Sequence, residues 1–202
     1  MQVHQNIRCQ GFPCSDVKHE CYCMPDAEIN PENISMVMIS EAAPQNASDY
    51  FYAGPEALFH QTTVQAFQDA GATVSSIDDI LDLGVYLTTA VKCGKTGYGI
   101  KADTIKTCSH LLEQELALFP HINVFMLMGD VAIKAVNYMA KRAGEGRVIP
   151  AGSTYKIRGS EYFFRGKRAF PSYVQAGPSF FIEKSKRTMI AEDIAAALSF
   201  LP

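Results

Sequence analysis

Three short apolar runs, each followed by a helical pattern, constrain the fold of this chain more than any other feature. The runs are Ile34–Ser40, Val85–Val91 and Asn123–Met128. Continuously apolar runs of this length are typical of strands that are covered on both faces, as in parallel sheets with helical connections. The repeated order of strand and helix therefore predicts an α/β domain with a mainly parallel sheet.

The helices between these runs have recognisable ends. One is expected over Pro55–Ala70, where Pro55 fits the first turn. A second begins at Asp103, a residue that caps helices well, and extends to about Leu118. A third follows Gly129 and extends to about Arg142. These three helices connect the apolar runs in the way a layered α/β fold requires.

The pattern changes near Tyr155. Short strands are expected at Tyr155–Arg158, Tyr162–Arg165 and Arg168–Tyr173, and an Ala-rich helix at Thr188–Leu201 closes the chain. We therefore predict a single domain over residues 1–202, with three α/β/α layers around a central, mainly parallel, four-stranded sheet.

The cysteines fall into two groups. They are Cys9, Cys14, Cys21 and Cys23 in a polar N-terminal segment, and Cys93 and Cys108 around the second connecting helix. No secretory signal is visible, so we expect a cytoplasmic protein, in which thiol clusters more often hold metal than form disulfides. The layout predicts one metal or iron–sulfur centre that attaches residues 1–33, a Cys-rich N-terminal wrap, to the core.

Charge is distributed unevenly along the chain. The whole chain carries −3, whereas Tyr155–Arg187 carries eight basic and two acidic residues. Such a segment can form a local phosphate-binding face, although a solvated hairpin would look the same. No apolar run reaches the ~18–20 residues of a membrane span, so no membrane partner is expected.

The sheet also predicts where a ligand binds. In parallel sheets, ligands lie beyond the carboxyl ends of the strands. The loops that leave those ends are Glu41–Tyr52, Lys92–Lys101, Gly129–Asp130 and Val174–Lys186. A functional site should draw its residues from them.

Three segments carry a resemblance to a known family. They are LTTAVKC (Leu87–Cys93), the run HLLEQEL (His110–Leu116) that follows Cys108, and NVFMLMGDVAIKAV (Asn123–Val136). Together they resemble the iron–sulfur uracil-DNA glycosylases, family 4 of the uracil-DNA glycosylase superfamily. The resemblance extends from about Ile34 onward and implies a three-layer fold and a [4Fe–4S] cluster.

The cluster ligands follow from this resemblance. It implies two N-terminal cysteines together with Cys93 and Cys108. Cys9 and Cys14, which flank a tight Gly-Pro loop, are the preferred N-terminal pair, and Cys21 or Cys23 could replace one of them. Four thiolates would also suit zinc, and the sequence does not separate the two.

The resemblance also implies active-site residues. Glu41, in Ser40–Pro44, matches the acidic residue of the family's Gly-Glu-Ala-Pro-Gly motif, although one residue is inserted and both glycines are absent. Phe51 fits the family's base-stacking phenylalanine. Thr89 replaces its base-reading asparagine. Gly177, Pro178 and Ser179 replace its His-Pro-Ser motif without the histidine.

Each of these residues has a chemical rationale and a plainer alternative. Glu41 can stabilise the positive charge that builds on the sugar or orient water, or it is a solvated carboxylate. Phe51 can stack on a flipped base or plug the core. The Thr89 hydroxyl cannot pair with both a carbonyl and an N–H as an amide does, and a core role is equally simple.

The last loop adds a phosphate-binding set. Lys184, Lys186 and Arg187 follow the Gly177–Ser179 turn and its two phenylalanines, so they are candidates to hold DNA phosphates. His110 and His121, in or after a helix, are expected to be surface residues.

The sequence therefore favours a DNA repair glycosylase, acting as a monomer, that hydrolyses the N-glycosidic bond of uracil or another damaged base in DNA. Two alternatives remain open. One is a non-catalytic nucleic-acid-binding member of the same superfamily. The other is an N-glycosidase that acts on free nucleosides or nucleotides.

Overall fold

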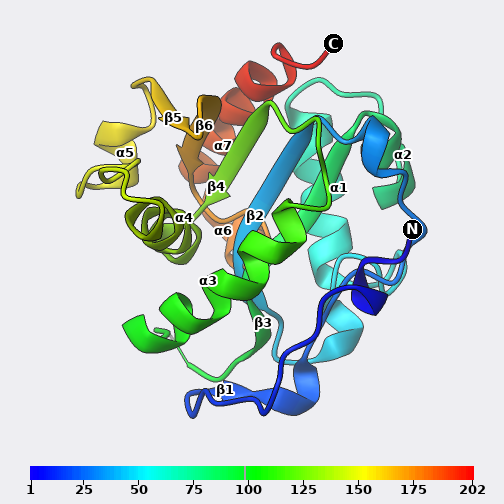
Figure 1. Ribbon diagram of the computed structural model, residues 1–202. Helices are drawn as coiled ribbons and strands as arrows, with labels where there is room; N and C mark the ends of the chain where they lie inside the picture. Colours follow the sequence, from blue (N-terminus) through cyan, green and yellow to red (C-terminus); the bar gives the residue numbers. More distant parts are fainter. Residues whose placement is uncertain (98) are drawn as a thin grey trace.

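One sheet organises the fold, in a computed structural model that describes residues 1–97 and 99–202. The strand order is β1-β3-β2-β4-β6-β5 (Figure 1). The strands are β1 (Val17–Lys18), β2 (Met36–Ala43), β3 (Val85–Lys95), β4 (Val124–Met128), β5 (Tyr162–Phe164) and β6 (Lys167–Ser172). The four central strands, β3, β2, β4 and β6, are parallel, and β1 and β5 pair antiparallel at the edges.

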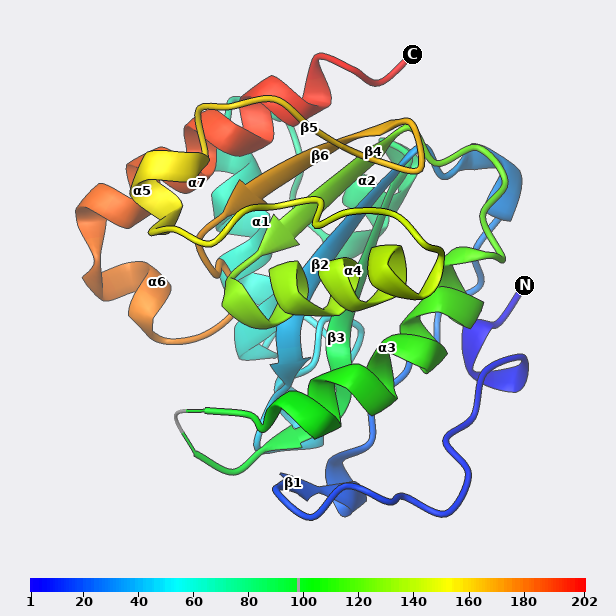
Figure 2. The same ribbon diagram turned by 60° about the vertical axis from the view of Figure 1, so that its left-hand side comes forward.

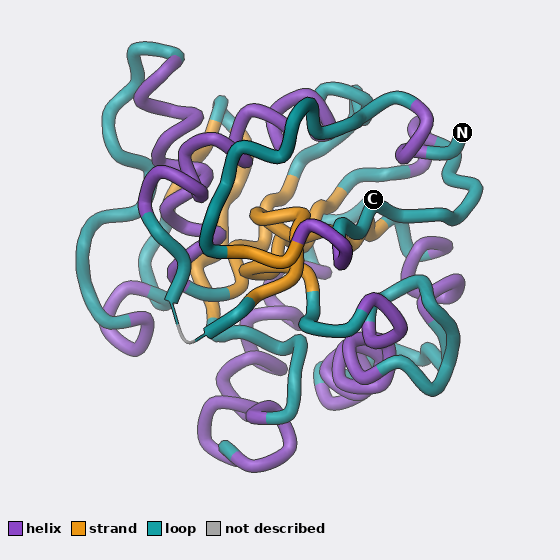
Figure 3. Tube along the Cα trace, turned by 90° about the horizontal axis from the view of Figure 1, so that it is seen from below, coloured by secondary structure: helices purple, strands orange, loops and turns teal. Residues whose placement is uncertain are grey.

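Helices connect and cover these strands. They are α1 (Leu58–Asp69), α2 (Ile77–Asp82), α3 (Ala102–Leu116), α4 (Asp130–Arg142), α5 (Thr154–Ile157), α6 (Ser179–Ile182) and α7 (Lys184–Leu198). Short 3₁₀ turns are η1 (Val3–Gln5), η2 (His19–Cys21), η3 (Pro31–Asn33) and η4 (Ala47–Asp49). Seen along another axis, the helices surround the strands (Figure 3).

Side-chain alternation along the strands divides the core into two layers. Along β2, Val37 and Ile39 pack with α3, α4 and the N-terminal segment, whereas Met36 and Met38 pack with α1, α2 and α7. Successive strand residues point to opposite faces, so both faces of the sheet are buried (Figure 2). The predicted three-layer α/β fold is thus confirmed.

The sheet has six strands rather than the four expected, because two short antiparallel strands extend the parallel centre. β5 corresponds to an expected strand, but β1 has only two residues and no detectable period. Its pairing with Gly94 and Lys95 lengthens β3. Cys93 therefore lies within a strand and not at its end.

Two other expectations were wrong. The strand predicted at Tyr155–Arg158 is the helical turn α5, because four residues are too few to distinguish alternation from one turn of helix. The closing helix begins at Lys184 and not at Thr188, since its first turn is polar and lacks an apolar signal.

Helix α3 is capped from a distant part of the chain. It begins at Ala102, and Asp103 lies in its first turn instead of capping it. The Asp16 carboxylate accepts hydrogen bonds from Lys101 N at 2.7 Å and from the Thr104 hydroxyl. Asp16 therefore satisfies the first turn of α3 and attaches the N-terminal segment to it.

No helix among residues 1–97 and 99–202 combines the length and apolar character needed to cross a bilayer.

Candidate active site and cysteine cavity

Glu41 lies near the carboxyl end of β2, where the parallel strands open onto a cavity of about 560 Å³. We call this the Glu41 cavity. It is lined by Ser40, Glu41, Ala42, Ala43, Pro44, Gln45, Asn46, Asp49, Leu58, Phe59, Lys95, Val174, Ala176, Gly177, Pro178 and Ser179. Residues from the expected loops after β2 and β6 therefore meet here, at the edge where such folds bind ligands.

The Glu41 side chain is held on two sides. Its Oε2 lies 3.2 Å from Lys95 Nζ, and the two side chains are 20% and 29% exposed. A Cβ at Gly129 would lie 2.8 Å from Glu41 Oε1, and Gly129 has φ +97°. The strand-to-helix turn after β4 therefore needs glycine, both for its backbone and for the space that Glu41 occupies.

A second cavity, of about 240 Å³, also reaches Glu41. Its walls include Asp130, Lys186 and Arg187, and it shares Val174 and Ser179 with the Glu41 cavity. The carboxylate thus stands between two hollows at the same edge of the sheet.

The loop at Gly177 is brought to Glu41 as expected. Gly177, Pro178 and Ser179 all line the Glu41 cavity, and Gly177 has φ +123°, a conformation that favours glycine. The loop leads directly into α6. Glu41 and this loop, 136 positions apart in sequence numbering, share one site.

Phe51 is placed differently from the exposed aromatic that base stacking requires. It is 0% exposed and packs against Phe59 with ring centroids 5.2 Å apart. Its neighbour Tyr52 donates from its hydroxyl to Leu87 O at 3.0 Å, which holds this aromatic run against β3. Phe51 therefore packs in the hydrophobic core, and Phe59 is the aromatic side chain that lines the Glu41 cavity.

Thr89 lies in β3 next to Ser40 in register. Its side chain is 0% exposed, and its hydroxyl has no hydrogen-bond partner among the described residues. It does not line the Glu41 cavity. An unpaired buried hydroxyl is costly, which makes Thr89 unusual, but its role as a base contact stays a prediction.

Sequence reasoning missed three residues of this site. Phe59 lies in a helix whose apolar pattern gives no sign that one ring lines a cavity. Gln175 is fully buried and accepts a hydrogen bond from Ser40 Oγ at 3.0 Å. Lys95 lies in the segment Lys92–Lys101 that was expected at this edge, so its charge and position were the available signal.

The three cations proposed for phosphate binding are not equivalent. Lys184 is exposed and has no ion-pair partner in the described chain. Lys186 lies 2.5 Å from Glu183 and over the Tyr173 ring. Arg187 forms a two-pronged pair with Asp69 on α1, with Nη2 2.8 Å from Oδ1. Of the three, Lys184 is the best placed to meet a phosphate.

Arg187 is therefore predicted to stabilise the fold. Its hydrogen bond lowers the pKa of Asp69. Arg187→Met should cost on the order of 1 kcal/mol at pH 7, or roughly 2–4 °C in thermal midpoint. Because the folded pKa of Asp69 is depressed, this contribution is present above about pH 4 and is lost as the pH falls through that pKa.

Thermal melts of Arg187→Met and Lys184→Met at pH 7 and pH 3 test this assignment. Lys184→Met removes the same charge and should melt like the unmodified chain at both pH values. Equal midpoints for the two variants at pH 7 would contradict a structural role for Arg187.

Further basic residues of the segment Tyr155–Arg187 are also engaged within the fold. Arg158 lies 2.8 Å from Asp193 and 2.8 Å from Glu192 on α7. Arg165 pairs with Glu113, which also lies 2.7 Å from Arg142. Three of the eight basic residues of the segment, Arg158, Arg165 and Arg187, are therefore paired with acids distant in sequence.

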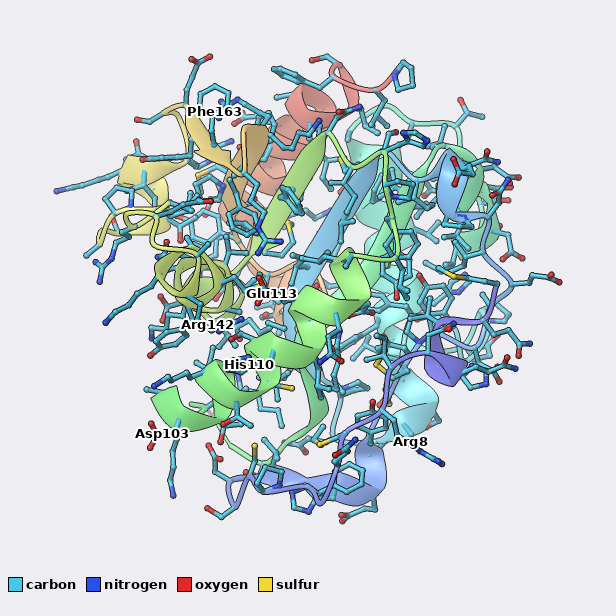
Figure 4. The ribbon with its side chains drawn as sticks, viewed as in Figure 1. Arg8, Asp103, His110, Glu113, Arg142 and Phe163 are labelled. Carbon is cyan, nitrogen blue, oxygen red and sulfur yellow. The ribbon has the colours of Figure 1, made fainter. Side chains whose placement is uncertain are left out.

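Figure 4 places Glu113 on α3 close to Arg142 at the end of α4. His110 is labelled on the same helix and is exposed. His121 is paired with Glu32 at 2.8 Å, and both side chains are mostly exposed. Neither histidine lines the Glu41 cavity, in agreement with their expected surface positions.

Four cysteines line a third, small cavity on the α3 face of the sheet. They are Cys9, Cys14, Cys93 and Cys108, and the aromatic side chains of Phe12 and Tyr22 complete the wall. Here the structure brings together the two groups of thiols separated in sequence. These are the four that the sequence analysis selected, and their role as ligands stays a prediction.

A sharp turn and several hydrogen bonds hold the backbone around the cysteine cavity. Gly11 and Phe12 have φ +71° and +41°, so the chain turns sharply between Cys9 and Cys14. The backbone N–H of Lys92 donates to Cys108 Sγ at 3.3 Å. The His19 ring nitrogen Nε2 lies 2.6 Å from Cys14 O. The turn and these contacts fix the loop that carries the first pair of thiols.

Burial and neighbouring thiols also shift the pKa values of the cysteines in this cavity. Burial, followed by the nearby Cys108, Cys9 and Cys14, raises the pKa of Cys93 to about 12. Burial likewise raises the pKa of Cys108 to about 11, although the hydrogen bond from the Lys92 N–H partly offsets this effect. No three His, Cys, Asp or Glu side chains in the described part of the chain are placed to share a single metal ion.

The other two cysteines lie elsewhere. Cys21 Sγ donates to Gln45 O at 3.1 Å and so contacts the loop after β2. Cys23 packs in the core layer of α1, α2 and α7. All six thiols are unpaired, with no disulfide between them.

A buried ion pair adjoins the cysteine cavity, which Lys92 lines. Lys92 and Glu115 are both 0% exposed and contact each other directly. Lys92 Nζ also donates to Thr88 Oγ1 and Thr89 O, each at 2.6 Å, and Tyr86 donates to Glu115. Every charge is satisfied, so the network fixes β3 against α3 where Cys93 and Cys108 come together.

Comparison with known proteins adds a partial match. A stretch of 59 residues is 34% identical to the Type-5 uracil-DNA glycosylase of Thermus thermophilus. It covers 29% of this chain and 27% of that protein's length. No family model matches the chain. The similarity supports kinship with the uracil-DNA glycosylase superfamily and does not distinguish among its groups.

Proposed function

We propose that this protein is a DNA glycosylase that hydrolyses the N-glycosidic bond of uracil or another damaged base. The observation that carries the proposal is the Glu41 cavity. A carboxylate and the turn Gly177–Ser179 line one hollow of about 560 Å³, roomy enough for a base, at the carboxyl edge of a parallel sheet. The partial similarity to a uracil-DNA glycosylase supports the same chemistry.

In the proposed reaction, the bond between C1′ and the base nitrogen breaks and its electron pair leaves with the base. Positive charge builds on the sugar, where the ionised Glu41 stabilises it and orients a water molecule. The water oxygen adds to C1′ and its proton passes through Glu41 to solvent. The base takes up a proton from solvent, so the products are free base and an abasic site.

The rest of the cavity binds the flipped base. The Phe59 ring lines the wall and can stack on it, a role that was assigned to Phe51 from the sequence. Thr89 is buried outside this cavity; its unpaired hydroxyl adjoins the lining residue Ser40 in the sheet and makes no direct contact with a base in this arrangement. Base edges would also meet the backbone groups of Gly177–Ser179, which can donate hydrogen bonds to charge that develops in the transition state.

DNA, rather than a free nucleoside, is favoured by the surface beside the cavity. Phe181 and Ile182 on α6 are 45% and 77% exposed, two and three positions after the cavity-lining Ser179. Apolar side chains that project next to a flipping site can wedge into the base stack, and Lys184 follows them to meet a phosphate.

We further propose that Cys9, Cys14, Cys93 and Cys108 hold a [4Fe–4S] cluster. Their donor set suits it, and the N–H···S bond to Cys108 is typical of sulfur ligands of a cluster. Zinc held by four thiolates would use the same residues, and the metal content of the purified chain separates the two centres. The cluster contributes a crosslink between the N-terminal segment and the core and takes no part in bond cleavage.

A panel of oligonucleotides tests the activity. Single- and double-stranded oligonucleotides, each with one uracil, hypoxanthine or xanthine, are incubated with excess protein, and abasic sites are measured by alkaline cleavage. We expect cleavage of at least one lesion and none of the undamaged strand. No abasic sites for any lesion, while a control glycosylase works, would contradict the proposal.

A second candidate is an N-glycosidase that acts on free nucleosides or nucleotides. It is favoured by the internal pairing of Arg158, Arg165 and Arg187, which engages three of the eight basic residues of the segment Tyr155–Arg187 within the fold. Deoxyuridine and its monophosphate distinguish the two functions. Release of uracil from these at the rate seen with an oligonucleotide would favour the second candidate.

A further inference from the structure

Lys95 is the cation of the Glu41 cavity. Among the described lining residues, the charged ones are Glu41, Asp49 and Lys95. Two negative groups suit the positive sugar of an N-glycosidic transition state, but they oppose the negative charge that builds on the leaving base. Position 177 is glycine and supplies no side chain, so Lys95 is the lining group whose charge can meet that anion.

The position of Lys95 is fixed by its backbone. β1 pairs with β3 through Val17 and Lys95, and through Lys18 and Gly94. A Cβ at Gly94 would lie 2.7 Å from Cys21 Cβ and 2.8 Å from Pro44 O, so the N-terminal segment and the loop after β2 close tightly around this point. The root of the Lys95 side chain is therefore held rigidly at the mouth of the cavity.

The Lys95 ammonium group has N–H donors that are not used within the described part of the protein. One hydrogen bond, of 3.2 Å, goes from Lys95 Nζ to Glu41 Oε2. An ammonium carries three N–H donors, so two remain for a ligand in the cavity. The side chain is only 29% exposed, and a charge there is screened less by water than one on the open surface.

We propose that Lys95 is a catalytic residue that stabilises the departing base. Its ammonium faces the negative charge that develops on the base as the C1′–N bond breaks, while Glu41 faces the sugar. The inference rests on the proposed glycosylase function. Lys95 acts as a fixed positive charge and transfers no proton, and the free base is protonated by solvent.

Leaving-group dependence separates this role from a structural one. Uracil leaves as a poorly stabilised anion, whereas the fluorine of 5-fluorouracil withdraws electrons and stabilises the anion itself. Loss of the Lys95 charge should therefore slow uracil release more than 5-fluorouracil release. If Lys95 only positions Glu41, both rates should fall by the same factor.

The experiment measures single-turnover release of uracil and 5-fluorouracil from otherwise identical oligonucleotides. For Lys95→Met we expect a loss of about 100-fold with uracil and roughly tenfold with 5-fluorouracil, on the scale of one lost transition-state donor. Lys95→Arg should keep most of the activity with both. Lys18→Met, in the paired strand β1 but outside the cavity, is the matched control and should behave as the unmodified chain.

Thermal melting and affinity for undamaged DNA are measured for each variant, and Lys95→Met is expected to change neither. Equal losses with both bases, or no loss, would overturn the role of Lys95 while the glycosylase function stands. Failure of the unmodified chain to release either base would overturn the glycosylase function and this inference with it.

Discussion

Glu41→Gln is expected to slow base release by about 100- to 1,000-fold and to leave the fold intact. The substitution keeps the size of the side chain and one carbonyl oxygen, but it removes the negative charge that faces the sugar. Since Glu41 is about one-fifth exposed and its ion pair with Lys95 is partly solvated, the thermal midpoint should move little. Single-turnover release of the best base in the lesion panel is the measurement.

A matched control removes a carboxylate that lies outside the site. Asp103 is exposed in the first turn of α3, at the far end of that helix in Figure 4, and Asp103→Asn makes the same change of charge. It should release base at the unmodified rate. If Glu41→Gln and Asp103→Asn were equally active, the carboxylate of Glu41 would have no chemical role and the non-catalytic DNA-binding alternative would gain support.

Cys93→Ser and Cys108→Ser are expected to abolish iron binding. The purified chain should be brown, with about four irons, if the cysteine cavity holds a [4Fe–4S] cluster. Metal affinity contributes directly to folding free energy, so a lost ligand should cost several kcal/mol, and the thermal midpoint should fall by on the order of 10 °C. Iron analysis, the visible spectrum and a thermal melt measure these effects.

The control for this prediction is Cys21→Ser. Cys21 is buried but lies outside the cysteine cavity, and a serine hydroxyl can replace its hydrogen bond to Gln45 O. This variant should keep its iron. Stoichiometric zinc in the unmodified chain would contradict the iron–sulfur assignment, and no bound metal at all would remove the proposed crosslink.

The sheet could be predicted because its central strands are continuously apolar. An uninterrupted apolar run such as Val85–Val91 indicates a strand that is buried on both faces. β1 could not be predicted, since its two residues become a strand only when the N-terminal segment folds back onto β3. The same tertiary contact extended β3 beyond the predicted end.

Those residues of the site could be predicted whose place follows from the strand order of the sheet. Glu41 lies near the carboxyl end of β2 and Gly177 in the loop that leaves the carboxyl end of β6, so the topology places them at the same edge of the sheet. The burial of Phe51 was not predictable, because all three adjacent aromatic residues turn out to lie outside the cavity and the ring that lines it, Phe59, belongs to the following helix. The ion pair of Arg187 was not predictable, since its partner Asp69 lies 118 positions away in the sequence and only the folded chain pairs them.

The most direct test of the account is detection of the free base itself. Uracil-containing DNA is incubated with excess protein, and released uracil is measured by mass spectrometry next to the same reaction with Glu41→Gln. We expect uracil to approach one equivalent per strand with the unmodified chain, and the variant to release it at least about 100-fold more slowly. Tight binding of the DNA without any free base would contradict it.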